Sequence, residues 1–119
     1  MAVEEQVQLS IDVDDRGGGG PVVVAVAGEL DFATTPALLD AAVPLAEAGR
    51  ELVLDLDGLV FCDSSALSAL VRLHKAATGS GGSLLLARPR SAVLAALRMA
   101  TLDRLFAISD GPPPGGARR

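Results

Sequence analysis

Aromatic side chains and metal ligands are scarce in this chain of 119 residues. It contains three Phe and no Trp or Tyr, and it carries a formal net charge of −5 at pH 7. A nucleic-acid surface needs a basic stripe and rings that stack on bases, so the composition argues against a nucleic-acid partner. One His and one Cys, with no HxxxH or CxxC spacing, leave only carboxylates to complete a metal site. We therefore predict no structural metal and no cofactor.

Long apolar runs and paired cysteines are also missing. No apolar run approaches the roughly eighteen residues that a membrane-spanning helix needs, and the opening stretch MAVEEQVQLS lacks a basic segment followed by a hydrophobic one. Cys62 is the single cysteine, so it cannot form an internal disulfide, and we expect a reduced, mostly buried thiol. These absences predict a cytoplasmic protein that does not insert into a membrane.

Two apolar segments near the start of the chain have the pattern of β-strands. Residues 6–13 alternate polar and apolar without a miss, as in a strand with one buried face. Residues 22–27, VVVAVA, are mostly β-branched and wholly apolar, as in a more central strand covered on both faces. Acidic residues and four glycines lie between the two segments. The pattern predicts a hairpin that ends at Gly28.

Helical patterns follow the later strands, which indicates an α/β domain. Residues 52–56 and 84–87 are short apolar runs bounded by Gly, charge or Pro, and we predict two interior strands there. A helix is predicted over residues 37–48, because a threonine able to cap it and Pro36 in its first turn precede it. Pro44 lacks an N–H group and is expected to kink or break that helix.

The C-terminal part of the chain contains one more helix and a tail. Residues 91–100 are predicted to be helical, and a short edge strand is expected at 105–108. The last residues, GPPPGGARR, have no means of packing. We predict one domain over residues 1–110 and a disordered Pro/Gly-rich tail over 111–119.

The stretch FCDSSALSAL, residues 61–70, places an acid and two serines where a helix begins. Asp63 or Ser64 would cap that helix by accepting hydrogen bonds from its free N–H groups. A Ser-His catalytic pair is excluded, because His74 lies on the same helix about 15 Å further along, at about 1.5 Å per residue. An exposed polar stripe recurs on this helix at helical spacing: Ser68, Arg72, Lys75 and Gly79.

Four aspartates, at positions 31, 55, 57 and 63, fall at predicted strand ends or in loops. Carboxylates in such places could perform acid/base chemistry or hold a small ligand. No glycine-rich phosphate loop or nucleotide fingerprint accompanies them. An enzyme or a small-ligand carrier is therefore the remote alternative, and a deep pocket lined by Asp31, Asp55 and Asp63 would support it.

Three motifs resemble a known family. GELD at 28–31, LDLDGLVFCDSSALSALVRLHKA at 54–76 and LDRLFAI at 102–108 resemble the STAS domains of bacterial anti-sigma factor antagonists. Together with the order of strands and helices, the resemblance covers roughly residues 5–109. It implies the STAS fold, a small mixed β-sheet of four to five strands with helices packed mainly on one face.

The resemblance also implies a binding protein and not an enzyme. In this family the unmodified domain binds an anti-sigma factor that is also a serine kinase, and so frees a sigma factor to join RNA polymerase. Phosphorylation ends that binding, and a serine phosphatase would reset it. By position in the motif, Ser64 is the phosphoacceptor.

Further residues receive a role through the same resemblance. Asp31 corresponds to the acid that closes the GELD loop beside the phosphoacceptor, and Asp63 and Ser65 are its neighbours in the motif. We expect these three residues to shape the partner-binding site. The exposed stripe that includes Ser68, Arg72 and Lys75 is expected to meet the partner.

One residue departs from the family pattern, which has glycine after the serine pair. This chain has Ala66, and we expect its Cβ to lie where the backbone of a kinase or partner must approach closely. The departure suggests an alternative: a STAS scaffold subunit of a signalling or transport assembly, in which the serine is never phosphorylated.

Overall fold

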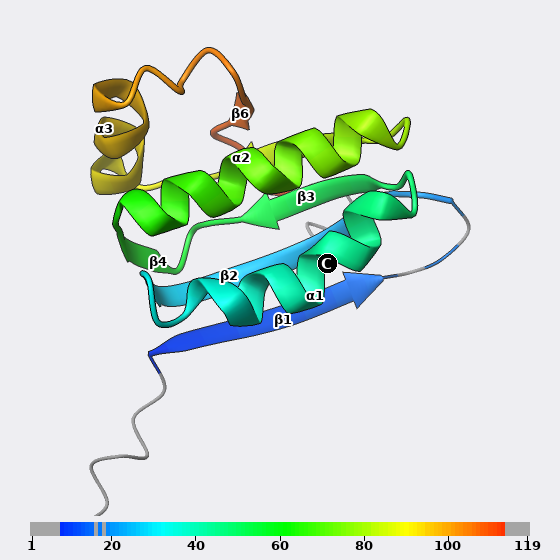
Figure 1. Cartoon of the computed structure of the whole chain (residues 1–119), viewed down its shortest axis with the longest axis horizontal. Helices are drawn as coiled ribbons and strands as arrows, with labels where there is room; N and C mark the ends of the chain where they lie inside the picture. Colours follow the sequence, from blue (N-terminus) through cyan, green and yellow to red (C-terminus); the bar gives the residue numbers. More distant parts are fainter. Residues whose placement is uncertain (1–7, 16, 18, 114–119) are drawn as a thin grey trace, which may run out of the picture.

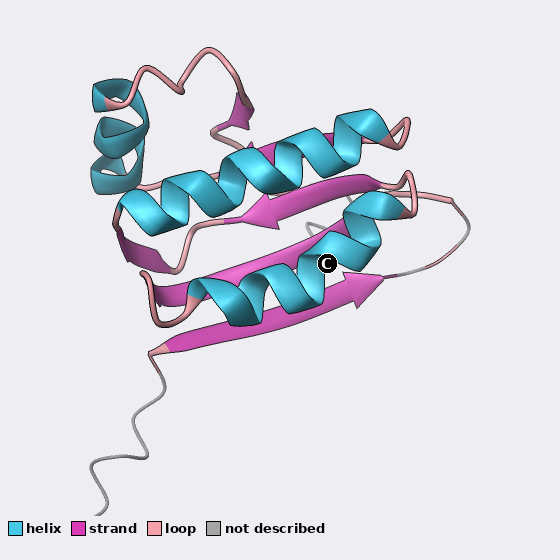
Figure 2. Cartoon of the chain, viewed as in Figure 1, coloured by secondary structure: helices cyan, strands magenta, loops and turns pink. Residues whose placement is uncertain are grey.

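The chain folds into one mixed β-sheet with three helices (Figure 1; Figure 2). The computed structural model describes residues 8–15, 17 and 19–113. The strands are β1 (Leu9–Asp15), β2 (Val22–Leu30), β3 (Glu51–Asp55), β4 (Leu59–Cys62), β5 (Ser83–Ala87) and β6 (Ala107–Ser109). The helices are α1 (Thr35–Glu47), α2 (Ser64–Gly79) and α3 (Ser91–Met99).

The sheet has the strand order β1-β2-β3-β5-β6, with β4 paired to β2 outside this sequence of neighbours. Strand β1 is antiparallel to β2, which confirms the predicted hairpin pairing, and the other pairs are parallel. The pairing of β1 with β2 ends at Gly28, but the second strand extends past this predicted end, because β2 continues to Leu30 and pairs there with β4. Strand β3 pairs with the first half of β2, and β4 pairs with its last residues, Gly28 to Leu30. This second pairing brings Leu30 beside Cys62, and so places the GELD motif next to the start of α2.

The main core lies between the sheet and helices α1 and α2, which cover one face (Figure 1). Alternate residues of each strand point into it, as the two-residue period of a strand requires. From β2 these are Val22, Val24 and Val26, and they meet Leu70 and Leu73 of α2 in a single buried cluster. On the opposite face, the described residues form a small buried cluster of Val23, Val53 and Ala87. Within the described ranges, no helix combines the length and apolar character needed to cross a membrane.

The predicted fold class is confirmed, and the structure corrects its details. The sheet has six strands instead of four to five, because β4 and β6 are separate strands of only 4 and 3 residues. Helix α1 begins at Thr35 and continues through Pro44 to Glu47, so the predicted break is wrong. Pro44 lies in the last turn and is exposed, so the carbonyl that loses its helical partner can bind water.

The ends of the predicted domain extend beyond the described residues. The first residues of the predicted N-terminal strand, Gln6 and Val7, lie outside them, as do residues 114–119 of the predicted tail. Residues 111–113 are described, and Pro113 is buried.

Arg50 links the β1-β2 turn to the strand that follows α1. Its guanidinium donates two hydrogen bonds to the Asp15 carboxylate, at 2.9 and 3.3 Å, and one to the Gly20 carbonyl at 2.9 Å. The bond from Arg50, aided by the Gly17 N–H, lowers the pKa of Asp15 below its ordinary value. A carboxyl group with a lowered pKa stabilises the fold above its unfolded-state pKa, and this contribution is lost as the pH falls through the folded-state value.

The variant Asp15→Asn is therefore expected to be less stable than the wild type at neutral pH and to match it in acid. The difference in free energy of unfolding between the two proteins should shrink progressively as the pH falls below the ordinary carboxyl pKa of about 3.9. Asp12→Asn is the control, because it removes an exposed charge from the same strand. A constant difference between Asp15→Asn and the wild type across the pH range would contradict this role for the ion pair.

Candidate functional site

The GELD loop and the start of α2 are joined by two hydrogen bonds from opposite directions. The backbone N–H of Asp63 donates to the carbonyl of Leu30 at 3.2 Å. The backbone N–H of Phe32 donates to Oδ2 of Asp63, also at 3.2 Å. Two segments about thirty residues apart in the sequence therefore form one site, as the resemblance implied.

Asp63 is the N-cap of α2, which confirms one of the two predicted caps. Its Oδ1 accepts the backbone N–H of Ala66 at 3.0 Å, while Oδ2 holds the GELD loop. Ser64 is thus the first residue of the helix, and it is exposed. Its hydroxyl forms no hydrogen bond with another described residue, so it faces the solvent free of internal partners.

Asp31 closes its own loop. Its Oδ1 accepts the backbone N–H groups of Ala33 and Thr34, each at 3.0 Å. The Thr34 hydroxyl accepts the Asp31 N–H and lies 2.9 Å from the carbonyl of Glu29. The sequence predicted that a threonine before Pro36 would cap α1; Thr34 is the N-cap residue, and its side chain forms no capping hydrogen bond. The hydroxyl is engaged by the GELD loop instead.

Two grooves run along α2, one on each side of its exposed ridge. We call them the α3-side groove and the α1-side groove. The α3-side groove is lined by Ser64, Leu67, Ser68, Val71, Ala100 and Leu102. The α1-side groove is lined by Phe32, Thr35, Leu39, Ser65, Ser68, Ala69 and Arg72. Ser64 and Ser65 therefore open onto different grooves, and the predicted stripe of Ser68, Arg72 and Lys75 forms the exposed ridge between them.

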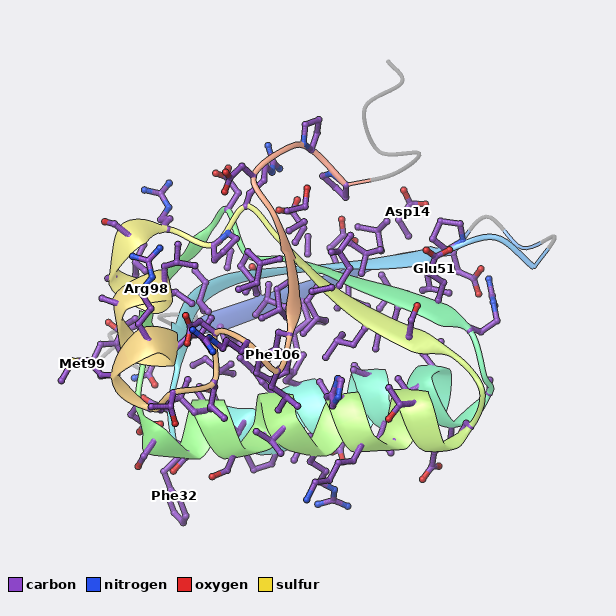
Figure 3. The ribbon with its side chains drawn as sticks, turned by 90° about the horizontal axis from the view of Figure 1, so that it is seen from above. Asp14, Phe32, Glu51, Arg98, Met99 and Phe106 are labelled. Carbon is purple, nitrogen blue, oxygen red and sulfur yellow. The ribbon has the colours of Figure 1, made fainter. Side chains whose placement is uncertain are left out.

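Two exposed apolar side chains near the start of α2 were not identified from the sequence. Phe32 is 80% exposed and Met99 is 88% exposed. Both project from the end that carries the start of α2 (Figure 3). The period of α3 could have identified Met99, because Val93 and Leu97 define its buried face and Met99 falls off it.

Ala66 does not lie on the exposed surface, which corrects the expectation from the family pattern. It is 0% exposed and belongs to the main core, together with Leu70 and Leu73 on the same helix. Its methyl group points away from any partner that approaches Ser64. The alanine is a packing residue, and it gives no reason to doubt access to the serine.

Three other side chains, those of Arg88, Cys62 and His74, interact with groups inside the fold. Arg88 donates to both carboxylate oxygens of Asp55, at 2.8 and 3.2 Å. Burial raises the pKa of the Cys62 thiol, and the nearby Asp63 carboxylate adds to the rise. His74 makes an edge-to-face contact with Phe106, with 5.6 Å between ring centroids.

Three of the four carboxylates predicted as candidates for acid/base chemistry thus hold structural bonds, and the fourth, Asp57, is exposed. Asp31 and Asp63 bind backbone N–H groups, and Asp55 pairs with an arginine. Among the described residues, no group of three or more His, Cys, Asp or Glu side chains could hold a metal ion. The site that the fold assembles is a surface around the exposed hydroxyl of Ser64, with two shallow grooves.

Comparisons with known proteins agree with this arrangement. Residues 13–108 match the family model described as "Mlab, STAS domain". The chain is 36% identical over 76 residues to the anti-sigma-B factor antagonist of Bacillus subtilis (strain 168), which covers 64% of this chain and 70% of that protein. It is 31% identical over 101 residues to a STAS-domain containing protein of Pseudomonas aeruginosa (strain UCBPP-PA14), covering 85% of this chain and 100% of the relative.

A solved structure extends the agreement to three dimensions. The crystal structure of an anti-sigma factor antagonist from Mycobacterium paratuberculosis superposes with a TM-score of 0.76 at 26% sequence identity, covering 87% of this chain and 86% of that one. The family match spans β2 to α3, which includes the GELD loop and the start of α2. The chain belongs to the STAS domain family.

Proposed function

We propose that this protein is an anti-sigma factor antagonist controlled by phosphorylation. In its unmodified form it binds an anti-sigma factor that is also a serine kinase, and thereby frees a sigma factor. Phosphate on Ser64 ends that binding, and a serine phosphatase restores it. The observation that carries the proposal is the exposed, internally unbonded hydroxyl of Ser64 beside the GELD loop. The name of the Bacillus subtilis relative supports it.

The position of Ser64 suits a reversible modification of a folded protein. A phosphate at the first turn of a helix lies near free N–H groups and the positive end of the helix dipole. Asp63 already binds the N–H of Ala66, so the free groups are those of Ser64 and Ser65. The phosphorylated helix can therefore keep its structure, while the surface gains nearly two negative charges.

The same proposal assigns the surrounding residues to the partner. Asp31 and Asp63 hold the loop and the helix in register, and Ser65 opens onto the α1-side groove. The ridge residues Ser68 and Arg72 stand between both grooves, and Lys75 follows them along the helix. The protein would act in the cytoplasm by binding alone, without catalysis of its own.

The test is phosphosite mapping by intact-mass and fragment mass spectrometry of the protein isolated from its own cells. We expect one phosphate, on Ser64, that disappears in Ser64→Ala. Ser65→Ala is the matched control, since it removes the adjacent hydroxyl and should leave the phosphate in place. Phosphate on another residue would refute the assignment, and its absence under every growth condition would favour the unphosphorylated scaffold.

Restoring the family glycine with Ala66→Gly is expected to weaken the fold without improving phosphorylation. The change removes a buried methyl group and adds glycine flexibility inside a helix, which together cost about 1.5 kcal/mol. Urea unfolding measures the loss of stability, and a kinase assay compares the rates at Ser64. Faster phosphorylation of the glycine variant would show that the alanine does obstruct the kinase.

A further inference from the structure

Charge is divided very unevenly along this chain. The first 63 residues contain thirteen acidic and two basic residues, whereas residues 64–109 contain six basic residues and a single acid, Asp103. The acids of the first part lie largely on β1, α1 and the strand-end loops. The bases lie on α2, on α3 and in the segments that flank α3, which occupy the upper part of the view in Figure 1, above α1 and β1. In a protein with a net charge of −5, the basic residues are therefore concentrated on α2, on α3 and in the segments that flank α3.

Most of these basic side chains have no acidic partner within the fold. Arg88 is in an ion pair with Asp55, and Arg90 donates to the backbone carbonyl of Asp57. The remaining four are exposed and form no ion pair with any described residue: Arg72, Lys75, Arg98 and Arg104. Their charge is available to something outside the chain.

The α3-side groove lies among these charges. Ala100 and Leu102 form its wall on the α3 side, and Arg98 and Arg104 stand two residues to either side of them along the chain. Figure 3 shows Arg98 and Met99 together on α3. Leu67 and Val71 of α2 form the opposite wall, and Lys75 follows Val71 by one helical turn, so cations lie close in sequence to both walls of this shallow apolar channel.

We propose that the α3-side groove and its flanking cations dock an acidic protein segment that inserts an aliphatic side chain. The inference rests on the proposed function, in that the segment would belong to the same anti-sigma partner. Carboxylates would meet Arg98, Arg104 and Lys75, while the aliphatic side chain would occupy the channel. Such a hydrophobic anchor within a charged rim is the usual composition of a specific protein interface.

An acidic protein segment fits this surface better than a nucleic acid or an anionic lipid surface does. Among the described residues that line the two grooves, Phe32 is the one aromatic ring, and it lies on the α1 side of the ridge, away from the α3-side groove. The α3-side lining therefore offers no ring on which a base could stack. Helix α3 buries Val93 and Leu97 in the core, so its apolar face is not free to enter a lipid surface.

This surface also gives the phosphorylation a physical target. Ser64 lines the same groove, so its phosphate would add negative charge to the surface that receives the partner's carboxylates. The phosphate would repel those carboxylates and compete for the cations.

The probe is a synthetic helical peptide of Glu and Ala with one Leu in each turn, labelled for fluorescence anisotropy. We expect the peptide to bind the unmodified protein, and its affinity should fall as the NaCl concentration rises from about 0.1 M to about 1 M. The same peptide with Lys in place of Glu should not bind, and one with Ser in place of Leu should bind less tightly.

The protein variant for this test is Arg98→Gln/Arg104→Gln, which should weaken the acidic peptide about tenfold. Its control is Ser10→Glu/Ser83→Glu, which lowers the net charge equally through exposed strand residues and should bind like the wild type. Circular dichroism confirms that both variants are folded.

Three results would overturn the inference: equal binding of the acidic and basic peptides, wild-type affinity of the glutamine variant, or tighter Arg98- and Arg104-dependent binding of anionic vesicles or homopolymer RNA. Peptide binding needs no kinase, so it is separable from phosphosite mapping. If the acidic peptide binds but Ser64 carries no phosphate in cells, the docking site stands and the phosphorylation switch is refuted. If Ser64 is phosphorylated but the peptide does not bind, only the docking site is refuted.

Discussion

Replacing Gly28 with alanine is expected to lower the free energy of unfolding by about 3 kcal/mol and to disrupt the GELD loop. Gly28 has a φ of +107°, which side-chain-bearing residues rarely adopt, and an added Cβ would overlap the backbone carbonyl of Gln8. The residue also sits at a register shift between β2 and β4. Any movement here would displace the pairing that brings Leu30 beside Cys62.

The measurement for Gly28→Ala is urea unfolding, followed by the rate of Ser64 phosphorylation in the folded fraction. Gly79→Ala is the matched control, because nothing lies within 4 Å of its added Cβ and it ends a helix. That control should be as stable as the wild type or up to about 1 kcal/mol more stable. A Gly28→Ala protein with wild-type stability would contradict the close contact between Gly28 and the Gln8 carbonyl.

Phosphorylation of Ser64 is expected to weaken binding of the anti-sigma partner by about a hundredfold, and Ser64→Glu by about tenfold. A like-charge contact at about 4 Å costs about 1 kcal/mol in water and up to about 4 kcal/mol in a partly buried interface. A phosphate carries nearly twice the charge of a glutamate. Titration calorimetry with the purified partner gives both dissociation constants directly.

Ser10→Glu is the control for this binding experiment. Leu9 and Ile11 pack against the main core, so Ser10, between them on β1, points to the face of the sheet opposite the helices. The added charge is the same, and only its position differs. Equal losses of affinity in Ser64→Glu and Ser10→Glu would show that net charge, and not the site, controls the binding.

The parts of the site that could be predicted from the sequence are those set by local signals. An acid followed by two serines and an apolar helical pattern predicts a cap at Asp63, and the structure has it. The alternation over residues 9–13 predicts the edge strand that pairs with β2. The burial of Ala66 could also have been predicted, because Ala66, Leu70, Leu73 and Ala77 are spaced by four, three and four residues and so share one face of the helix.

The remaining parts depend on which segments meet in space. Strand β4 has four residues, and nothing local shows that it pairs with the end of β2 instead of extending β3. The bond from Phe32 to Asp63 joins residues 31 positions apart, so its existence follows from that pairing. The hydrogen bonds of Thr34 have the same origin. Its hydroxyl can bond either to the N–H groups at the start of α1 or to the backbone of the GELD loop, and in the structure it bonds to the loop.

The two hydrogen bonds between the GELD loop and Asp63 have a consequence for how a kinase would recognise its substrate. Many protein kinases read a short extended peptide, but here the acceptor serine is in a helical turn whose neighbour in space is the loop at residues 30–32. The epitope is discontinuous, so a peptide of residues 58–70 should be a poor substrate. Denatured or nascent chains would escape modification, and the phosphate would mark only molecules that have completed folding.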